Sequence, residues 1–202
     1  MVSAVVLAAG QSKRMGEKKE LLPVGGEPMI ARVMDALLRS EKIDEIVVVL
    51  GARADAVGLA LSGISDERVE FVGNARYAEG MGTSLAQGAR ACSWGTETIL
   101  VVLGDAPFVR TEDVERLIEA AGEGARIVVP VSAGRRGHPV VFDGTYREAL
   151  ESLDGDAGAR AILERESGVV REIEIDDEWF LVDIDTRDDY EAVKDRLGGA
   201  VD

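Results

Sequence analysis

The sequence predicts an α/β fold: a single three-layer α/β/α domain around a mostly parallel sheet, with an antiparallel element near the C-terminal part. Short apolar runs alternate with amphipathic segments of helical length almost to the end of the 202 residues. The runs Glu45–Leu50 and Thr98–Leu103 are apolar almost throughout, which is typical of strands covered on both faces. Helices between such strands favour parallel pairing.

Strands in the first two thirds of the chain are predicted from β-branched, apolar runs. They cover Val2–Leu7, Glu45–Leu50, Val69–Val72, Thr98–Leu103 and Ile127–Val131. The predicted helices between them cover Pro28–Arg39, about Arg53–Leu61, Thr83–Cys92, and Thr111 to about Ala121. Pro28 suits a helix start, and Thr111 suits a helix cap followed by acidic residues in the first turn.

The pattern changes after Val131, where we expect a substrate-side region within the same domain. Val169–Ile175 alternates like an antiparallel strand. Two further strands are predicted over Val140–Phe142 and Phe180–Ile184. Helices are predicted over Tyr146–Leu153, Ala157–Glu166, and Thr186 to about Leu197, with Thr186 as the cap.

Composition excludes several classes of function. The net charge of −15 argues against proteins that bind nucleic acid or an anionic membrane surface. No apolar stretch approaches the ~20 residues of a membrane span, and no signal peptide is visible, so we expect a cytoplasmic protein. The one cysteine, Cys92, excludes an intramolecular disulfide and is predicted to be a small core residue.

The segment that follows the first strand is a positive island in an acidic chain. Residues 1–20 hold four basic and two acidic side chains. A loop of small residues with several cations suggests a cradle for phosphates. Gly10 and Gly16 are separated by five residues and Glu17 follows, so the P-loop pattern fails. No Gly-x-Gly-x-x-Gly follows the strand, so a dinucleotide fold is not supported either.

This loop resembles the signature of nucleotidyltransferases, which move a nucleoside monophosphate from an NTP onto a phosphate. The matching residues are Leu7-Ala8-Ala9-Gly10-x-Ser12-x-Arg14-Met15-Gly16-x-x-Lys19-x-x-Leu22-Pro23. The resemblance implies nucleotide contacts from Leu7, Ala8, Ala9, Gly10 and Ser12. It implies catalytic and nucleotide-binding roles for Arg14, a two-pronged phosphate ligand, and for Lys19, a compact charge. Lys13 and Lys18 are expected to be solvated neighbours.

Two carboxylates are candidate ligands of Mg²⁺. Asp105 directly follows an apolar strand, where open α/β sheets bind their ligands, and the resemblance makes it catalytic. Magnesium is usually held by one or two carboxylates plus substrate phosphates. In related nucleotidyltransferases the position matched by Asp185 supplies the second ligand, and Asp183, on the same face of the predicted strand, is the alternative.

Further motifs resemble the molybdenum cofactor cytidylyltransferases, a MobA-like group with a Rossmann-like fold. Asn74, Gly82 and Ser84 match the region that holds the base and ribose. Gly137-His138-Pro139 and Gly155-Asp156-x-Gly158-Ala159-Arg160 separate this group from sugar-phosphate enzymes and imply that His138 and Arg160 bind the acceptor. Ala9 favours CTP over GTP. The resemblance divides the domain into a nucleotide-binding part, about 1–110, and an acceptor-binding part, about 111–202.

The implied reaction transfers CMP from CTP to the terminal phosphate of a molybdopterin-type cofactor and releases pyrophosphate. A molybdoenzyme apoprotein or its chaperone would be the recipient of the product. Three alternatives remain open. They are a guanylyltransferase of the same superfamily, a nucleotidyltransferase for another phosphorylated small acceptor, and a cofactor-binding chaperone without chemistry. Paired metal carboxylates argue against the last, since a binding protein has no need of them.

Overall fold

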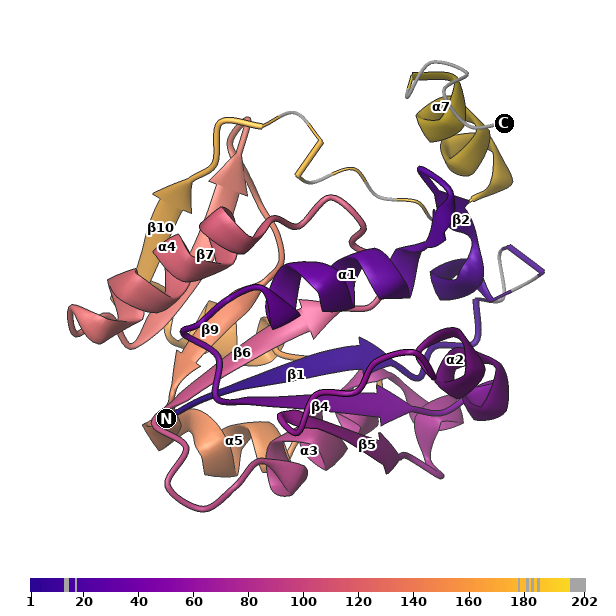
Figure 1. Ribbon diagram of the computed structural model, residues 1–202. Helices are drawn as coiled ribbons and strands as arrows, with labels where there is room; N and C mark the ends of the chain where they lie inside the picture. Colours follow the sequence, from indigo (N-terminus) through magenta and orange to yellow (C-terminus); the bar gives the residue numbers. More distant parts are fainter. Residues whose placement is uncertain are drawn as a thin grey trace.

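The computed structural model describes residues 1–12, 15, 16, 18–177, 179, 180, 182, 184 and 186–196, with only the backbone of Arg196. Its described residues form an eight-stranded sheet in the order β10-β7-β9-β6-β1-β4-β5, with β8 paired to β7 (Figure 1). The strands are β1 (Val2–Ala8), β4 (Glu45–Leu50), β5 (Val69–Gly73), β6 (Thr98–Leu103), β7 (Ile127–Ser132), β8 (Arg135–Arg136), β9 (Val140–Asp143) and β10 (Val170–Glu174).

Helices cover both faces of this sheet (Figure 1). On one face the core contains Ala4 and Val6 of β1 with apolar residues of α1 (Met29–Leu38), α2 (Ala54–Ala60) and α4 (Thr111–Gly122). On the other, Val5 and Leu7 pack with residues of α3 (Met81–Ala91), α5 (Arg147–Glu151) and α6 (Arg160–Arg165). Alternate β1 residues thus serve opposite cores, which explains why this strand is apolar from Ala4 to its end.

Strand directions confirm the predicted mostly parallel sheet. β1 pairs in parallel with β4 and β6, and β4 pairs in parallel with β5. β9 is antiparallel to both β6 and β7, which confirms an antiparallel element in the C-terminal part. The antiparallel direction expected for Val169–Ile175 is wrong, because β10 pairs in parallel with β7. Alternation does not fix the pairing direction here: β10 lies at the edge of the sheet, with Val170 and Ile173 partly buried and Arg171, Glu172 and Glu174 exposed.

Element boundaries agree with the predictions to within a few residues. Of the two predicted helix caps, Thr186 is confirmed and Thr111 is wrong. Thr186 caps α7 (Arg187–Arg196), since its Oγ1 accepts from Asp189 N at 3.2 Å while Asp189 Oδ2 accepts from Thr186 N at 2.8 Å. Thr111 does not cap α4: Arg110 holds the cap position, and Thr111 Oγ1 donates to Ala36 O at 2.8 Å. That hydroxyl joins α4 to α1 instead.

The segment before α7 differs from its prediction. No strand includes Phe180, Val182 or Ile184, which are the described residues of the predicted strand over 180–184. The predicted last residue of α7, Leu197, lies outside the described residues. The sequence pattern also did not single out two short elements, the hairpin of β2 (Pro23–Val24) with β3 (Glu27–Pro28) and the strand β8.

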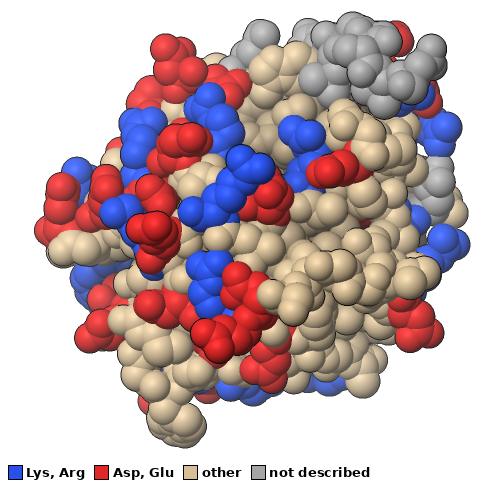
Figure 2. Space-filling view, in the orientation of Figure 1, with Lys and Arg blue, Asp and Glu red and all other residues tan. Residues whose placement is uncertain are grey.

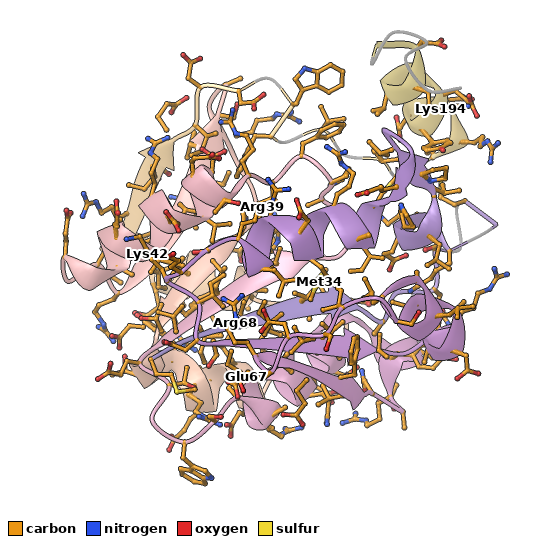
Figure 3. All side chains as sticks on the ribbon, in the orientation of Figure 1. Met34, Arg39, Lys42, Glu67, Arg68 and Lys194 are labelled. Carbon is orange, nitrogen blue, oxygen red and sulfur yellow. The ribbon has the colours of Figure 1, made fainter. Side chains whose placement is uncertain are left out.

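Arg68 fastens the turn between α1 and β4 (Figure 3). Its Nη2 donates to Leu38 O at 2.7 Å, and its Nη1 donates to Ser40 O at 3.0 Å and Ile43 O at 3.1 Å. Asp66 pairs with the same guanidinium at 2.9 Å. Carbonyls at the end of a helix have no partner within the helix, so this side chain satisfies groups that would otherwise need water.

Charged side chains of both signs are interleaved on the face shown in Figure 2. Around α4, Lys42 pairs with Glu119 at 3.1 Å and Arg171 pairs with Glu123 at 2.7 Å. No described helix is both long and apolar enough to cross a bilayer.

Candidate active site

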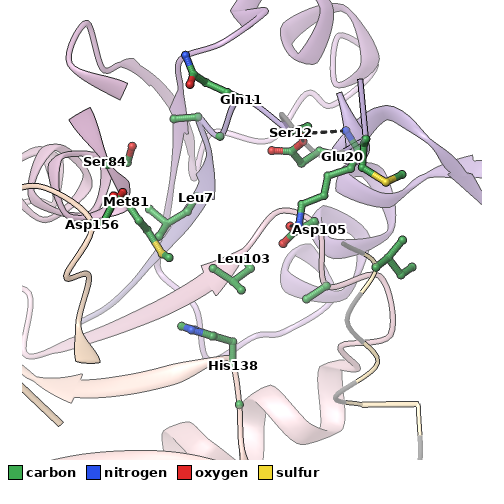
Figure 4. A pocket seen from close by; sticks show the side chains of 18 of the residues that line it. Leu7, Gln11, Ser12, Glu20, Met81, Ser84, Leu103, Asp105, His138 and Asp156 are labelled. Atoms are coloured by element: carbon green, nitrogen blue, oxygen red, sulfur yellow. Dashed lines mark hydrogen bonds and ion pairs between the residues drawn. The ribbon is translucent and has the colours of Figure 1, made fainter. Parts of the chain in front are cut away.

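A cavity of about 740 Å³ opens at the carboxyl ends of β1 and β6 (Figure 4). Leu7 of β1 and Leu103 of β6 form part of its floor, and the loop after each strand forms part of its wall. This is the edge at which parallel α/β sheets bind ligands. Of the residues predicted for the site, eight line the cavity: Leu7, Ala9, Gly10, Ser12, Lys19, Ser84, Asp105 and His138.

The remaining predicted site residues fall into two groups. Arg14, Asp183 and Asp185 fall outside the described residues, so their roles stay predictions. Four others do not line the cavity: Ala8, Asn74, Gly82 and Arg160. The side chain of Arg160 is 86% exposed and pairs with Glu164 at 2.9 Å on its own helix, which gives no support to an acceptor-binding role.

Asp105 is held opposite the loop 9–12 by the close approach of two strand ends. Gly104 N donates to Leu7 O at 2.9 Å, which joins the end of β6 to β1. A Cβ at Gly104 would lie 2.8 Å from Ile30 Cδ1 and 3.0 Å from Leu7 O, so a side chain does not fit there. Glycine at this position therefore lets the carboxylate of the next residue reach the cavity.

Asp105 forms an ion pair with Lys19, which stands at the start of a short 3₁₀ helix, Lys19–Leu21. Both side chains are 19% exposed, so the pair is reached by solvent from the cavity. Among the described residues no group of three or more His, Cys, Asp or Glu side chains could hold a metal ion. Asp105 is thus the predicted metal ligand that the structure describes, and a metal here would need ligands from the substrate or from residues outside the described part.

Lys18 contradicts its prediction as a solvated residue. Its side chain is 1% exposed, and Nζ lies 2.9 Å from Glu20 Oε1. The same ammonium donates to Ala8 O at 3.0 Å and to Gly10 O at 2.6 Å. A buried lysine is rare unless it is paired, and here the pair lies directly under the loop.

Asn74 shapes the start of α3 and does not face the cavity. Its side-chain amide donates to Thr83 Oγ1 at 2.9 Å and to Ser84 Oγ at 3.0 Å, while its carbonyl oxygen accepts from Arg76 N at 2.9 Å. Of this cluster, Ser84 lines the cavity. Asn74 therefore acts on the cavity wall through Ser84.

Gly82 serves the packing of the same wall. Its N donates to Gly155 O at 2.7 Å, and a Cβ at this position would meet Asp154 O at 2.7 Å. The backbone of the 154–156 loop thus packs directly on the first turn of α3, and Asp156 from that loop lines the cavity.

An ion-pair cluster joins the same two segments at the rim. Arg76 pairs with Glu79 at 2.6 Å and with Asp154 at 2.9 Å. Hydrogen bonds from Arg76 lower the pKa of Glu79, so this carboxylate stays charged at neutral pH.

His138 lies across the cavity from Gln11 and Ser12 (Figure 4). It follows β8, whose two arginines also line the cavity. Arg136 Nε donates to Glu172 Oε1 at 2.7 Å, which engages its guanidinium. The side chain of Arg135 makes no ion pair or hydrogen bond with any residue in the part of the chain that the structure describes. Arg135 is thus an available cation at this end.

Several lining residues were not singled out from the sequence. They include Tyr77, Met81, Arg135, Asp156 and Phe180. Asp156 lies within the Gly-Asp-x-Gly-Ala-Arg motif, so the motif marked the segment, although the residue chosen from it was Arg160. Met81, the first residue of α3, likewise lies in the segment matched to the nucleotide-binding region, although Gly82 and Ser84 were chosen from it. Tyr77 lies before that segment, in the 3₁₀ helix Tyr77–Glu79, and only the fold brings it to the cavity.

Comparison with known protein families agrees with this geometry. Residues 4–170 match the MobA-like NTP transferase domain. The chain is 36% identical over 193 residues to nicotine blue oxidoreductase of Paenarthrobacter nicotinovorans, covering 92% of each chain. It is 30% identical over 200 residues to purine catabolism protein PucB of Bacillus subtilis, covering 94% of each.

Solved structures agree with the fold over almost the whole chain. Rv0371c of Mycobacterium tuberculosis superposes with a TM-score of 0.83 at 29% identity, covering 96% of this chain and 97% of the other. Its structure in complex with manganese gives 0.77 at 28% identity, covering 95% and 96%. A Methanothermobacter nucleotidyl transferase gives 0.80 at 30% identity, covering 98% and 97%. This chain therefore belongs to the MobA-like NTP transferase domain family, as the loop after its first strand and the further motifs together predicted.

Proposed function

We propose that this protein transfers CMP from CTP to the terminal phosphate of a molybdopterin-type cofactor, releasing pyrophosphate. The observation that carries the proposal is the position of Asp105 and Lys19, which meet in the cavity beside the loop Ala9–Ser12. A nucleotidyltransferase needs a carboxylate for a metal and a cation for phosphates within reach of one small-residue loop. Family membership supplies the general activity, and Ala9 favours cytidine as the base.

The nucleotide's triphosphate is proposed to lie along this loop, in the part of the domain formed by about 1–110. Gly10 and Ser12 border the cavity, and Lys19 stands beside them with a compact positive charge. Arg14, predicted from the signature, would add a two-pronged phosphate contact. Ser84 is proposed to contact the ribose or base.

A divalent metal is proposed at Asp105, with Asp185 as the second ligand. The partly exposed carboxylate of Asp105 fits this role, because Mg²⁺ commonly uses one or two carboxylates with substrate phosphates. The manganese complex of Rv0371c supports a divalent ion in a related protein. When bound, the metal would neutralise charge on the phosphates, and Lys19 would turn from Asp105 toward the substrate.

No general base is required for this chemistry. A phosphate monoester has a second pKa of about 6, so the attacking oxygen of the acceptor is already ionised at neutral pH. The residues then act by positioning the two phosphates and by neutralising their charge. Lys19 opposes the charge of the triphosphate.

The acceptor is proposed to enter from the part formed by about 111–202. His138 and Arg135 lie at this end of the cavity, and Arg135 offers a guanidinium for an anionic group of the acceptor. Arg160 was predicted for the same task, but it does not line the cavity and pairs with Glu164 on its own helix, so Arg135 is the better candidate.

Pyrophosphate release tests the proposal. Purified protein is supplied with Mg²⁺ and with CTP or GTP, with and without molybdopterin. We expect release that requires both CTP and the cofactor. Asp105→Ala should lower the rate by about a hundredfold or more while the circular dichroism spectrum stays unchanged. Asp55→Ala, an exposed carboxylate on α2, is the matched control and should keep the wild-type rate. Near-normal turnover of Asp105→Ala would contradict the role of this residue.

The same assay separates the alternatives. Turnover with GTP alone identifies a guanylyltransferase, and turnover with a sugar phosphate or another phosphorylated acceptor identifies a different substrate. Cofactor binding without pyrophosphate release identifies a chaperone.

One relative is named an oxidoreductase, so oxidation of NADH and NADPH is measured in parallel. The ion pair of Asp105 with Lys19 favours phosphate chemistry, since hydride transfer needs no metal carboxylate. Consumption of either nicotinamide without pyrophosphate release would overturn the transferase proposal.

A further inference from the structure

Two adjacent lysines in the loop segment have opposite surroundings. Lys19 reaches the cavity, whereas the side chain of Lys18 is 1% exposed. The Lys18 ammonium has three donors and three oxygen partners: Ala8 O at 3.0 Å, Gly10 O at 2.6 Å and Glu20 Oε1 at 2.9 Å. Every donor is therefore used inside the protein, and none is left for a ligand.

Glu20 continues this network toward Lys19. Its side chain is 4% exposed, and its second oxygen accepts a hydrogen bond from Ser12 Oγ at 3.2 Å. Ser12 Oγ in turn accepts from the backbone N of Lys19 at 3.1 Å. The chain of contacts thus runs from the carbonyls of the loop, through a buried ion pair and a hydroxyl, to the backbone of the residue that faces Asp105.

The network also holds a backbone conformation that needs support. Ser12 has a φ of 49°, in the left-handed region that residues other than glycine seldom adopt. Its hydroxyl is fixed by Glu20 and by Lys19 N, and its carbonyl accepts from Met15 N at 3.1 Å. On the other side of the loop, Ala9 O accepts from Ala52 N at 3.1 Å. The backbone of residues 8–12 is therefore fixed from both sides before any ligand binds.

We propose that Lys18 and Glu20 are positioning residues that set the spacing between the loop 8–12 and Lys19, and thereby the affinity for the triphosphate of a nucleotide. The inference rests on the proposed function for its ligand. A buried ion pair is seldom the most stable choice for a core position, because desolvation offsets the attraction. A cation that binds two carbonyls and a carboxylate at once does, however, specify one loop geometry.

The ion pair also neutralises a carboxylate that would otherwise face the cavity. Glu20 lines the cavity, where an unpaired carboxylate would repel phosphates, and Lys18 neutralises it. Lys19 then remains the described cation of this segment that faces Asp105. Removing Lys18 should therefore weaken nucleotide binding in two ways, by loosening the loop and by leaving an anion beside the triphosphate.

A double-mutant cycle tests the inference in the full chain, with Lys18→Met, Glu20→Gln and the double variant. Binding of CTP with Mg²⁺ is measured by calorimetry, well below each variant's Tm. We expect Lys18→Met to raise the Kd by about tenfold or more and Glu20→Gln, which keeps its shape, by about threefold. The double variant should bind more tightly than the product of the two effects predicts, because both residues act through one network.

Asp113→Asn is the matched control. Asp113 is a buried carboxylate that pairs with Arg110 at 2.7 Å on α4 and does not line the cavity. This variant should lower the Tm and leave the Kd for CTP at the wild-type value. A Kd that is unchanged in both single variants, with wild type binding CTP, would overturn the inference and leave the proposed function standing.

Hydrogen exchange gives a readout that needs no ligand. The amides of Met15, Lys19 and Ala52 donate hydrogen bonds to Ser12 O, Ser12 Oγ and Ala9 O. They should exchange about tenfold faster in Glu20→Gln, and faster still in Lys18→Met, while Asp113→Asn leaves them unchanged. Protection equal to wild type in both site variants would show that the pair does not hold the loop. If wild type binds neither CTP nor GTP, the proposed function fails, and the exchange result still decides whether Lys18 and Glu20 position the loop.

Discussion

Cys92 illustrates how burial changes the chemistry of one residue. It follows α3 with its side chain 3% exposed, and its Sγ donates to Gly88 O at 3.4 Å. Burial, reinforced by the charge of Glu45, raises the pKa of the thiol to about 11. The position confirms the prediction of a small core residue.

We therefore expect Cys92 to be inert in the folded protein. At pH 8 its reaction with a disulfide reagent such as DTNB should be about a hundredfold or more slower than that of a free thiol, because the thiolate is the reactive form. One thiol per chain should react in urea, which serves as the internal control. Rapid labelling of the native protein would contradict the burial of this side chain.

Arg135 leads to a prediction about the acceptor. Arg135→Ala should raise the KM for molybdopterin about tenfold, the cost of one charge-assisted hydrogen bond, and leave the KM for CTP unchanged. Arg171→Ala is the control: this exposed arginine on β10 pairs with Glu123 at 2.7 Å and does not line the cavity, so its removal should change neither constant. An equal change in both KM values would assign Arg135 to the fold of the cavity instead of to the acceptor.

The two lysines also show where residue-level prediction ends. Lys19 was identified by the signature, and the structure brings it to Asp105. Lys18 was expected to be solvated, because an irregular segment has no periodicity from which burial can be read. Its buried position depends on the carbonyls of residues 8 and 10, which are fixed only when the first strand has joined its neighbours.

At the scale of the elements, α3 packs on the sheet through a glycine. A Cβ at Gly88 would lie 2.3 Å from Val5 Cγ1 and 3.0 Å from Val49 Cγ2, so the helix rests directly on β1 and β4. Gly58, within α2, has no atom within 4 Å of the same position. The two helical glycines therefore differ in their surroundings while sharing the same intrinsic helix propensity.

Alanine at these two positions should change stability in opposite directions. Gly88→Ala should lower the free energy of unfolding by about 1–3 kcal/mol through overpacking. Gly58→Ala should raise it by about 0.5–1 kcal/mol, because alanine loses less backbone entropy on folding. Urea denaturation at equilibrium measures both. A stabilising Gly88→Ala would mean that α3 can move away from the sheet without loss.

Elements were predictable to the extent that periodicity alone defines them. β4 and β6 were predicted with their observed limits, because a buried parallel strand is a continuous apolar run. The direction of β10 was not, since exposure at a sheet edge gives the same alternation as antiparallel pairing. Hairpins of two-residue strands, such as β2 with β3, are too short to carry a period. The sequence could not show that Thr111 is not a helix cap, because the partner of its hydroxyl, Ala36 O, lies on another helix.

At the scale of the whole molecule, several carboxylates of this acidic chain are stabilised in their charged form by local hydrogen bonds and nearby cations. The chain has 38 Asp and Glu against 23 Lys and Arg. Burial by itself would raise the pKa of Glu45, but hydrogen bonds from Ser3 and Ser93, with the charge of Arg147, outweigh it and lower the pKa. Hydrogen bonds from Arg68 and Arg165 likewise lower the pKa values of Asp66 and Glu166. These carboxylates are distributed over the fold, so acid should act on the entire molecule.

Stability should fall in acid, since carboxylates with depressed pKa values bind fewer protons in the folded state than in the unfolded one. Their contribution is complete above the ordinary values of 4.5 for Glu and 3.8 for Asp, and it is lost as the pH falls through the lower folded values. From pH 7 to pH 5 few carboxylates bind protons, and those that do reduce the repulsion that comes with the net charge of −15, so the Tm should change little. Below pH 4.5 the carboxylates with depressed pKa values begin to lose their contribution, so the Tm should drop steeply.

Thermal unfolding followed by circular dichroism between pH 3 and pH 8 measures this profile. Glu45→Gln, which removes one of the depressed carboxylates, should have a lower Tm than wild type at pH 7, and the difference should shrink toward pH 3. Added salt should raise the Tm at pH 8, because it screens repulsion among the excess carboxylates beyond about 10 Å at 0.1 M. A Tm that stays constant to pH 3, or a Glu45→Gln difference that is independent of pH, would mean that these pairs do not contribute to folding.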